Sequence, residues 1–370
     1  TSWLTAATNI QDAIGISVSG DIVLVTNGVY WTRGAAPSGR ISINSAITVQ
    51  SVNGPEYTVI QGTNWPSDLR CASVTGGGRL FGFTLTKGRA DYGGGVYVAM
   101  TGSVVSNCVI LGNKAGYGGG CAFSGSALPG IGSGTVVDCV IKSNTATYGG
   151  GAYSNLLTRC VLVGNGGPEV STTIWGGGAF ACALNNCLVV SNVANYSAGA
   201  HGCIIQNSTL VGNYATYMGA AGVDESRVMN CVILDNRNFH GDIFNFGFGF
   251  QPMTNCCTWP MPSGKENTTN SPAFVNPLGG DFRLQFNSPC INAGNDKYAT
   301  NTLDLDGYSR KVGTADIGAY EFQSPASMLS YAWAQQNGLP TDGSADFSDA
   351  DGDGANNWQE WRADTIPTNS

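Results

Sequence analysis

The sequence predicts an all-β fold, a parallel β-helix, on three observations. Near-copies of the heptapeptide NCVILGN (107–113) recur along the chain, and their closing asparagines fall at 113, 144, 165, 192, 213 and 236. A glycine motif keeps the same phase, at 92–95, 117–120, 148–151 and 175–178 and in degraded form at 196–199 and 217–220. The apolar runs are only four or five residues long and rich in Val and Ile, which favours strands. Two motifs in phase, at intervals of 21 to 31 residues, indicate a solenoid of short strands.

Strand alternation sorts the side chains of each repeat into columns, because the second and fourth residues of NCVILGN face the same side. The predicted inward columns are Phe83, Cys108, Cys139, Cys160, Cys187, Ser208 and Cys231, and Leu85, Ile110, Ile141, Leu162, Val189, Leu210 and Ile233. We expect the cysteines to pack as small hydrophobic side chains and to stay mainly free thiols. The pairs to check for disulfides are Cys182 with Cys203 and Cys256 with Cys257.

Two further columns follow from the repeat. The closing asparagines suit a left-handed turn, since Asn tolerates positive φ, and their stacked side chains can form an amide ladder. The aromatic column consists of Tyr92, Tyr117, Tyr148, Trp175, Tyr196 and Tyr217. It could offer stacking faces to sugar rings or stack on itself, and we favour self-stacking. Asp138 and Arg159 share a column on successive coils and predict a cross-rung ion pair.

The ends of the coil differ from its middle. Ile10, Ala13 and Ile14 recur at helical spacing behind the capping candidates Thr8 and Asn9, which predicts a helix. A second short helix is expected at 330–338. The predicted organisation is a helical cap at 1–20, a β-helix at 21–322 with a closing segment at 270–322, a linker at 323–329 and a small helical module at 330–370.

The outward strand positions are more apolar than a solvated sheet face usually is. They hold Val109, Val140, Val161, Leu188 and Val232 and, two residues further on, Leu111, Val163, Val190, Val211 and Leu234. We expect either the C-terminal tail or another copy of the protein to cover this face. Self-association through this face or through the ends of the coil is therefore a predicted interaction.

Segments at both ends resemble a known family. NPLGGDFRLQFNSPCINAGN (276–295), DLDGYSR (304–310) and ADIGAYEF (315–322) are similar to the closing segment of bacterial right-handed β-helix proteins of the choice-of-anchor Q type. Residues 1–14 and 20–30 are similar to the start of the same group, so the resemblance covers about residues 1–322. It implies a right-handed β-helix, related in fold to polysaccharide lyases. It also implies an extracellular or surface protein of a bacterium, with its signal peptide already removed.

The C-terminal module carries an acidic loop, DADGDGANNWQE (349–360). Its spacing matches an EF-hand loop, in which three carboxylates on alternate residues converge before a glycine turn and a final Glu closes the shell. The loop also resembles dockerin-like and thrombospondin-type calcium repeats. The alternative is a solvated acidic loop. We expect a structural Ca²⁺ site formed by Asp349, Asp351, Asp353, the Ala355 carbonyl, Asn357 and Glu360.

Composition argues against two partner classes. Only 11% of the residues are charged and the formal net charge is -8, whereas nucleic-acid binding needs clustered Lys and Arg. No apolar run reaches the roughly 18–20 residues of a membrane span. The sequence therefore predicts neither a nucleic-acid partner nor a membrane span.

Candidates for chemistry are few. His201 lies in the column of Tyr97, Tyr153 and Phe180 and could line a groove. Arg237, His240 and Asp242 lie together on the irregular segment 235–250, which is expected to be an inserted loop. The alternative for this segment is a polar loop that packs on the coil through Phe244, Phe246, Phe248 and Phe250.

Two functions remain open. The first is a non-catalytic extracellular scaffold for adhesion, surface coating or filament-like self-assembly, supported by the low charge, the lack of a carboxylate constellation and the apolar outer face. The second is a carbohydrate-active enzyme, most directly a polysaccharide lyase acting on uronic-acid glycans. It rests on analogy of fold and on the 235–250 loop, and analogy of fold is weak evidence for activity. We prefer the scaffold, with a polysaccharide as the other candidate partner.

Overall fold

The computed structural model describes residues 6–31, 38–63, 68–125, 130, 132–166, 175–217, 219–247 and 252–368. The chain divides into two compact units: unit 1 holds Thr1–Ile204, Leu210–Ser226 and Asp235–Phe250, and unit 2 holds Ile205–Thr209, Arg227–Leu234 and Gln251–Ser370. Among the described residues, no helix has both the length and the apolar character needed to cross a membrane. The predicted boundaries at residues 20, 322 and 329 stay a prediction.

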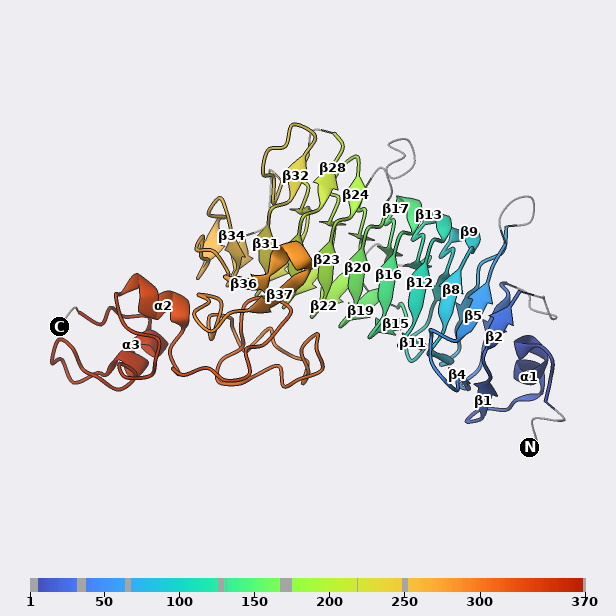
Figure 1. Cartoon of the computed structure of the whole chain (residues 1–370), viewed down its shortest axis with the longest axis horizontal. Helices are drawn as coiled ribbons and strands as arrows, with labels where there is room; N and C mark the ends of the chain where they lie inside the picture. Colours follow the sequence, from blue (N-terminus) through green and yellow to red (C-terminus); the bar gives the residue numbers. More distant parts are fainter. Residues whose placement is uncertain are drawn as a thin grey trace. The chain divides into compact units, whose positions relative to one another are not determined.

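Unit 1 is a parallel β-helix, and Figure 1 shows its short strands side by side as successive rungs. The unit 1 strands of one long sheet are β1 (Ile22–Val25), β4 (Thr48–Ser51), β7 (Arg79–Phe81), β11 (Val104–Ser106), β15 (Thr135–Val137), β19 (Leu156–Thr158) and β22 (Ala183–Asn185). Those of a second sheet are β2 (Gly28–Tyr30), β5 (Thr58–Gln61), β8 (Thr84–Thr86), β12 (Val109–Leu111), β16 (Val140–Lys142), β20 (Val161–Val163) and β23 (Leu188–Val190). The pairing within these sheets is parallel and in register, with Ile110 opposite Ile141. The predicted fold class is confirmed.

The third long sheet and two short sheets complete the coils of unit 1. The third sheet contains β3 (Ile41–Ile43), β6 (Ala72–Val74), β10 (Val96–Val98), β14 (Cys121–Ala122), β18 (Ala152–Tyr153), β21 (Ala179–Phe180), β25 (Ala200–His201) and β29 (Val223–Asp224). The short sheets contain β9 (Arg89–Tyr92), β13 (Lys114–Tyr117) and β17 (Thr145–Tyr148), and β24 (Val193–Ala194), β28 (Tyr214–Ala215) and β32 (Arg237–Asn238). The strands β26 (Ile204–Gln206) and β27 (Thr209–Val211) fall at sequence positions where the units divide.

The predicted N-terminal helix is present as α1 (Ile10–Ile16). Asn9 is its N-cap and accepts a hydrogen bond from the backbone N–H of Asp12, which satisfies one of the unpaired donors of the first turn. Ile10 and Ile14 are buried on one face of the helix. The amphipathic spacing in the sequence therefore located this element correctly.

The inward columns are confirmed. The second-position side chains of unit 1, Cys160 among them, and the fourth-position side chains such as Ile141 are almost completely buried. All twelve cysteines are buried and free, including the two pairs that we singled out for disulfides. The thiols therefore act as small core side chains, as expected.

The amide ladder is confirmed, but the expected left-handed backbone at its asparagines is wrong. Each ladder Nδ2 donates to the Oδ1 of the asparagine on the next rung, at 2.7–3.0 Å, from Asn113 through 144, 165, 192 and 213 to Asn236. Positive φ occurs instead at the first and sixth residues of the heptapeptide, for example Asn107 (φ 50°) and Gly112 (φ 62°). Asn144 uses its backbone N–H for the ladder as well, which holds its main chain along the coil axis.

The glycine motif packs directly against the ladder. A Cβ atom added to Gly120 would lie 2.6 Å from the carbonyl oxygen of Gly151 and 3.0 Å from Nδ2 of Asn144. Only glycine allows the next coil to approach this closely. The two motifs keep phase because they contact each other on each rung.

Unit 2 contains the remaining strands and the helical module. Its elements are β30 (Arg227–Met229), β31 (Val232–Leu234), β33 (Met253–Thr254), β34 (Cys257–Thr258), β35 (Gly264–Lys265), β36 (Phe274–Asn276), η2 (Pro277–Gly279), β37 (Asp281–Leu284), α2 (Tyr331–Gln336) and α3 (Asn357–Ala363). β30, β33 and β35 pair in parallel, as do β31 and β34, whereas β36 and β37 are antiparallel. The helix expected at 330–338 is present as α2, with Ser330 as its N-cap.

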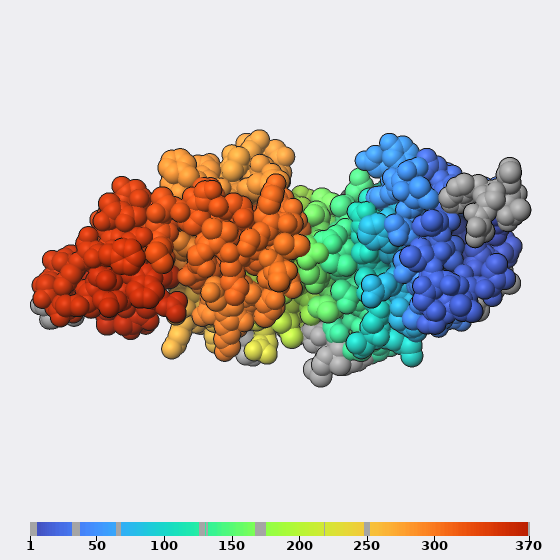
Figure 2. Space-filling view, turned by 90° about the horizontal axis from the view of Figure 1, so that it is seen from below, coloured from blue at the N-terminus to red at the C-terminus, as the bar shows by residue number. Residues whose placement is uncertain are grey.

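The closing segment covers the outward apolar face within unit 2. Val232 is fully buried in a cluster with Leu284, Ile291 and Ile317, and Leu234 packs against that cluster. Figure 2 shows the surface of this segment in orange. The cover of these residues is therefore the closing segment, to which the expected C-terminal tail adds Tyr331. In unit 1, outward residues such as Val109 and Val161 are half-buried.

The closing motifs meet in a buried polar network of unit 2. The fully buried guanidinium of Arg310 donates to Oε2 of Glu321 (3.4 Å), to the carbonyl of Asp316 (2.8 Å) and to Oδ1 of Asn207 (3.3 Å). The carboxylate of Asp304 accepts the backbone N–H of Glu321. Burial raises the pKa of Glu321 to about 9 and that of Asp316 to about 7. The residues that carry the family resemblance therefore serve the packing of this segment.

Candidate functional site

The loop after β32 does not bring the side chains of its predicted catalytic residues into contact with one another. Nη1 of Arg237 donates to the Gly241 carbonyl (2.8 Å), and Oδ1 of Asn238 accepts the backbone N–H groups of His240 and Asp242 (3.0 Å each). The imidazole of His240 is exposed and packs on the ring of Phe239. In the described part of this loop, no contact links that imidazole to Arg237 or Asp242. Their catalytic role stays a prediction.

The phenylalanines of the same loop belong partly to the coil. Phe244 and Phe246 are half-buried, as a loop that packs on the coil requires. Phe248 and Phe250 lie outside the described residues. The loop also returns Asn245 to the amide ladder, where its Oδ1 accepts from Nδ2 of Asn236 at 2.9 Å. The loop therefore extends the repeat structure that it interrupts in sequence.

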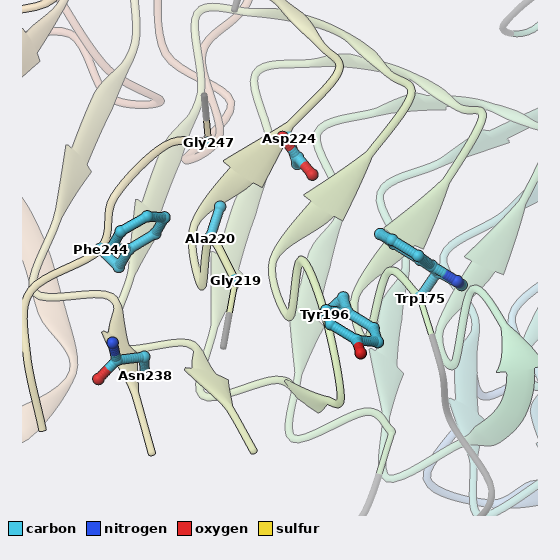
Figure 3. Close-up of a pocket in the computed structure, with 8 residues that line it drawn as sticks. All are labelled: Trp175, Tyr196, Gly219, Ala220, Asp224, Asn238, Phe244 and Gly247. Carbon is cyan, nitrogen blue, oxygen red and sulfur yellow. The ribbon is translucent and has the colours of Figure 1, made fainter. Parts of the chain in front are cut away.

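A groove of about 440 Å³ lies on unit 1 between the aromatic column and this loop (Figure 3). Its walls are Trp175, Tyr196, Asp224, Asn238 and Phe244, with the small residues Gly219, Ala220 and Gly247 between them. In Figure 3, Trp175 and Tyr196 lie on one side of the groove, and Phe244 and Asn238 lie on the other. The lining therefore combines aromatic side chains with one carboxylate and one amide.

The aromatic column stacks on itself, as we favoured. The ring centroids of Tyr92 and Tyr117 are 4.6 Å apart with planes 10° apart, and those of Trp175 and Tyr196 are 4.6 Å apart with planes 23° apart. The column changes after Tyr196, because Tyr217 meets its ring at 64° and is 56% exposed. The Trp175–Tyr196 pair in the groove wall is therefore stacked, and the regular stacking ends at Tyr217.

His201 is buried beside the groove, in the column predicted for it. It is the register partner of Phe180 on β21 and of Asp224 on β29. Its ring lies 4.7 Å from that of Trp175 and is only 8% exposed. Nδ1 is 3.3 Å from the Ser197 hydroxyl, so the imidazole faces protein groups on this side.

Two carboxylates flank the imidazole of His201. Nδ1 lies 3.9 Å from Oδ2 of Asp224, and Nε2 lies 3.6 Å from Oε2 of Glu225. Burial lowers the pKa of His201, although both carboxylates oppose that shift. Burial also raises the pKa of Asp224, and Glu225 adds to this while His201 opposes it. Because the imidazole is neutral at pH 7, the carboxylates keep their negative charge without compensation from it.

Asp224, Glu225 and Ser197 were missed as partners of His201, although the repeat contains the signal. The ladder asparagines on these two coils, Asn213 and Asn236, are 23 residues apart. Adding the same interval to His201 leads to residue 224.

The expected cross-rung ion pair of Asp138 and Arg159 is confirmed, with two hydrogen bonds of 2.7 and 2.8 Å.

The acidic loop of unit 2 brings three of its six predicted ligands together. Carboxylate oxygens of Asp349, Asp351 and Asp353 lie within 4.8 Å of one another. Glu360, the predicted ligand at position 12 of the loop, is only 1% exposed, and its Oε2 has no hydrogen-bond partner among the described residues. Burial raises the pKa of Glu360, and the negative charges of the three aspartates raise it further. Asn357 begins α3, and its amide donates to the Ala345 carbonyl at 2.8 Å.

This donor set fits a divalent cation. Among the described residues, no positively charged side chain forms an ion pair with the carboxylates of this loop, and a buried, unpaired carboxylate is costly. The N–H groups of Gly352 and Gly354 donate to Asp349, so the loop is already turned around its first residue. Oxygen ligands on alternate residues are the set that Ca²⁺ prefers.

The chain resembles known proteins in its structure but not in its sequence. No model of a known protein family matches the chain, and no curated protein matches its sequence. Pectate lyase Pel9A matches in structure with a TM-score of 0.53 and 18% sequence identity, over 86% of this chain and 92% of that one.

Two other solved structures are more distant. ORF18 of Geobacillus virus E2 has a TM-score of 0.34 and 16% identity, over 66% of this chain and 55% of that one. A pectin methylesterase in complex with a hexasaccharide has a TM-score of 0.30 and 11% identity, over 76% of this chain and 95% of that one. At these identities the likeness to Pel9A concerns the fold alone, and it shows that this chain is a right-handed parallel β-helix.

Proposed function

We propose that this protein is an exported bacterial β-helix scaffold of the choice-of-anchor Q type, which binds a polysaccharide at the groove of unit 1 without cleaving it. The groove carries this proposal. Binding sites for small molecules are lined mainly by aromatic and apolar side chains with a few polar groups that fix orientation. Trp175, Tyr196 and Phe244 supply the apolar walls here, and Asp224 and Asn238 can bond to sugar hydroxyls.

The geometry favours binding over catalysis. A lyase needs a base that reaches the substrate, together with a cation or Arg that neutralises a uronate. His201 is largely buried and faces carboxylates at both ring nitrogens. The described lining of the groove contains neither Lys nor Arg. The lyase alternative keeps the support of a shared fold with pectate lyase Pel9A.

Affinity electrophoresis on a panel of polysaccharides, together with absorbance at 235 nm for unsaturated products, distinguishes these functions. The proposal expects retarded migration in at least one gel, no rise in absorbance, and loss of retardation in Trp175→Ala. The matched control is Trp259→Ala, which changes an exposed tryptophan of unit 2. Product formation that is abolished by His240→Ala would establish the lyase instead.

We propose that Ca²⁺ stabilises the C-terminal module. Support comes from the convergence of Asp349, Asp351 and Asp353 and from the buried, unpartnered oxygen of Glu360. Extracellular sites of this kind bind with a Kd of about 10⁻⁴–10⁻³ M. Calorimetry should detect binding to the wild type and to Asp342→Asn, an exposed carboxylate outside the loop, but not to Asp351→Ala. Equal heats in all three proteins would show a solvated acidic loop.

Self-association is proposed through the N-terminal end of the coil. The outward side chains of β1 are apolar, with Ile22 62% and Leu24 52% exposed, and Ile16 and Val18 are also exposed. β1 is also an edge strand of its sheet, and such edges pair readily with other chains. Sedimentation at rising concentration should show assembly that Leu24→Asp prevents. A monomer at every concentration contradicts this proposal.

A further inference from the structure

We propose that the groove selects an uncharged polysaccharide and rejects uronic-acid polymers; this inference rests on the proposed function. Its basis is the charge of the groove. Asp224 is the charged side chain in the described lining, and Glu225 lies beside it in sequence, with its side chain 74% exposed. A uronate carboxylate in the groove would therefore meet like charge.

Of the positive side chains near the groove in sequence, Arg227 lies on β30 outside the described lining, and Arg237 is directed to other partners. The guanidinium of Arg237 donates to the Gly241 carbonyl and lies 3.9 Å from Asp235. That of Arg159 pairs with Asp138. The segments 167–174, 218 and 248–251, which the structure does not describe, contain no Lys or Arg in their sequence. None of these residues therefore compensates the negative charge of Asp224.

The buried imidazole does not supply this compensation either. His201 contacts Ser197, Asp224 and Glu225, and burial keeps it neutral at pH 7. Two like charges about 5 Å apart at a protein surface weaken binding by between roughly fourfold and a hundredfold, depending on the local screening. Uronate polymers should therefore bind at least about fourfold more weakly than a neutral polymer of similar linkage.

The remaining groups suit hydroxyl-bearing, uncharged rings. A Cβ atom at Gly247 would fall 2.0 Å from Oδ1 of Asp224, so this glycine lets the carboxylate lie close against the loop backbone. A carboxylate held in this way is a strong acceptor for sugar hydroxyls. Beyond the groove, Tyr217 and Phe239 are exposed and stack at 6.4 Å, which extends the aromatic surface along the coil.

The test compares matched polymers of the two charge classes. Affinity electrophoresis at low ionic strength is run with a neutral β-glucan and a neutral galactan, and with polygalacturonate and alginate. The wild type should bind a neutral polymer at least about fourfold more tightly than either uronate polymer. Asp224→Asn keeps the size of the side chain and removes its charge. In this variant the difference in affinity between neutral and uronate polymers should shrink by about threefold or more.

Asp91→Asn is the matched control, because Asp91 is an exposed acid on β9, outside the groove lining, and the variant should leave the affinity difference between the two polymer classes unchanged. Added salt should strengthen any residual uronate binding of the wild type, since screening weakens repulsion. This readout needs no variant and keeps the test valid if Asp224→Asn does not fold.

Equal or tighter binding of uronate polymers by the wild type, weakened by salt, would overturn the charge selection and leave polysaccharide binding intact. Binding of neither class would overturn both proposals. The two failures are therefore distinguishable.

Discussion

His201 and Asp224 are register partners on the parallel strands β25 and β29, with Nδ1 of the imidazole 3.9 Å from Oδ2 of the carboxylate. The pair forms because two successive coils place these residues at the same position, 23 residues apart. Its chemistry is set by burial, which lowers the pKa of the histidine and raises that of the aspartate. Neither shift could be inferred from the sequence, because burial of a side chain depends on the neighbouring coils.

Replacing His201 by Phe should stabilise the protein relative to the wild type as the pH falls below about 6.5. The folded state resists protonation of this histidine, whereas the unfolded chain does not, so stability that is present above the unfolded pKa is lost below it. Phe180 shows that the column accepts this side chain. Denaturant unfolding at pH 7 and pH 5 measures the difference, with the exposed His240→Phe as control. A difference that is the same at both pH values would contradict the expectation.

Asn165→Ala breaks the amide ladder. It should lower the free energy of unfolding by about 2–4 kcal/mol. The change removes the donor to the Ile141 carbonyl and leaves the buried amide of Asn144 without its acceptor. Urea denaturation of the variant gives the value. Asn53→Ala removes an exposed amide and should change stability by less than about 0.5 kcal/mol. Similar losses in both variants would show that the ladder is not specially stabilising.

The twelve buried thiols should not react with a thiol reagent in the native protein at pH 8 and should all react after denaturation in guanidinium chloride. Burial raises the pKa of Cys71, Cys203 and Cys256 to about 12, so very little thiolate is present at these three positions. The other thiols are kept from the reagent by their burial. Absorbance of the released chromophore counts the reactive groups in each state. Rapid labelling of several thiols in the folded protein would show that the core opens or that some cysteines are accessible.

Replacing Glu321 by Gln should make the protein increasingly stable relative to the wild type as the pH rises from 5 to 9. The pKa of Glu321 is raised to about 9, so the stability from its protonated form is complete below the unfolded value and is lost as the pH rises through the folded one. Gln remains uncharged throughout. The difference in Tm between the two proteins should grow by at least about 2 °C. The exposed Glu56→Gln is the control, and a constant difference for Glu321→Gln would refute the assignment.

Much of the fold could be predicted because the repeat carries it. The phase of the heptapeptide placed Cys160 and Ile141 in the core and aligned the ladder asparagines. The same arithmetic stacked Asp138 on Arg159. Each coil contacts mainly the next one, so residues one period apart become neighbours and local sequence is sufficient.

The prediction for the turn was wrong for a related reason. Both the first and the sixth residue of the heptapeptide adopt positive φ, as at Asn107 and Gly112, whereas the closing asparagine does not. Residue type alone suggested the asparagine, because it tolerates that conformation. Its backbone is instead committed to hydrogen bonds along the ladder, as the N–H of Asn144 shows.

By itself, the sequence determined the parallel coils, the inward columns and the spacing of the acidic loop, because each depends on a period or a fixed local pattern. It left open whether the aromatic column stacks on itself or offers its rings to sugars. Only the tertiary structure decided what the non-repeating parts do. The 235–250 loop returns Asn245 to the ladder and places Phe244 opposite Trp175, which creates the groove around Asp224. Packing determines the course of such a loop, because it follows no period, and so no spacing in the sequence could predict where its side chains lie.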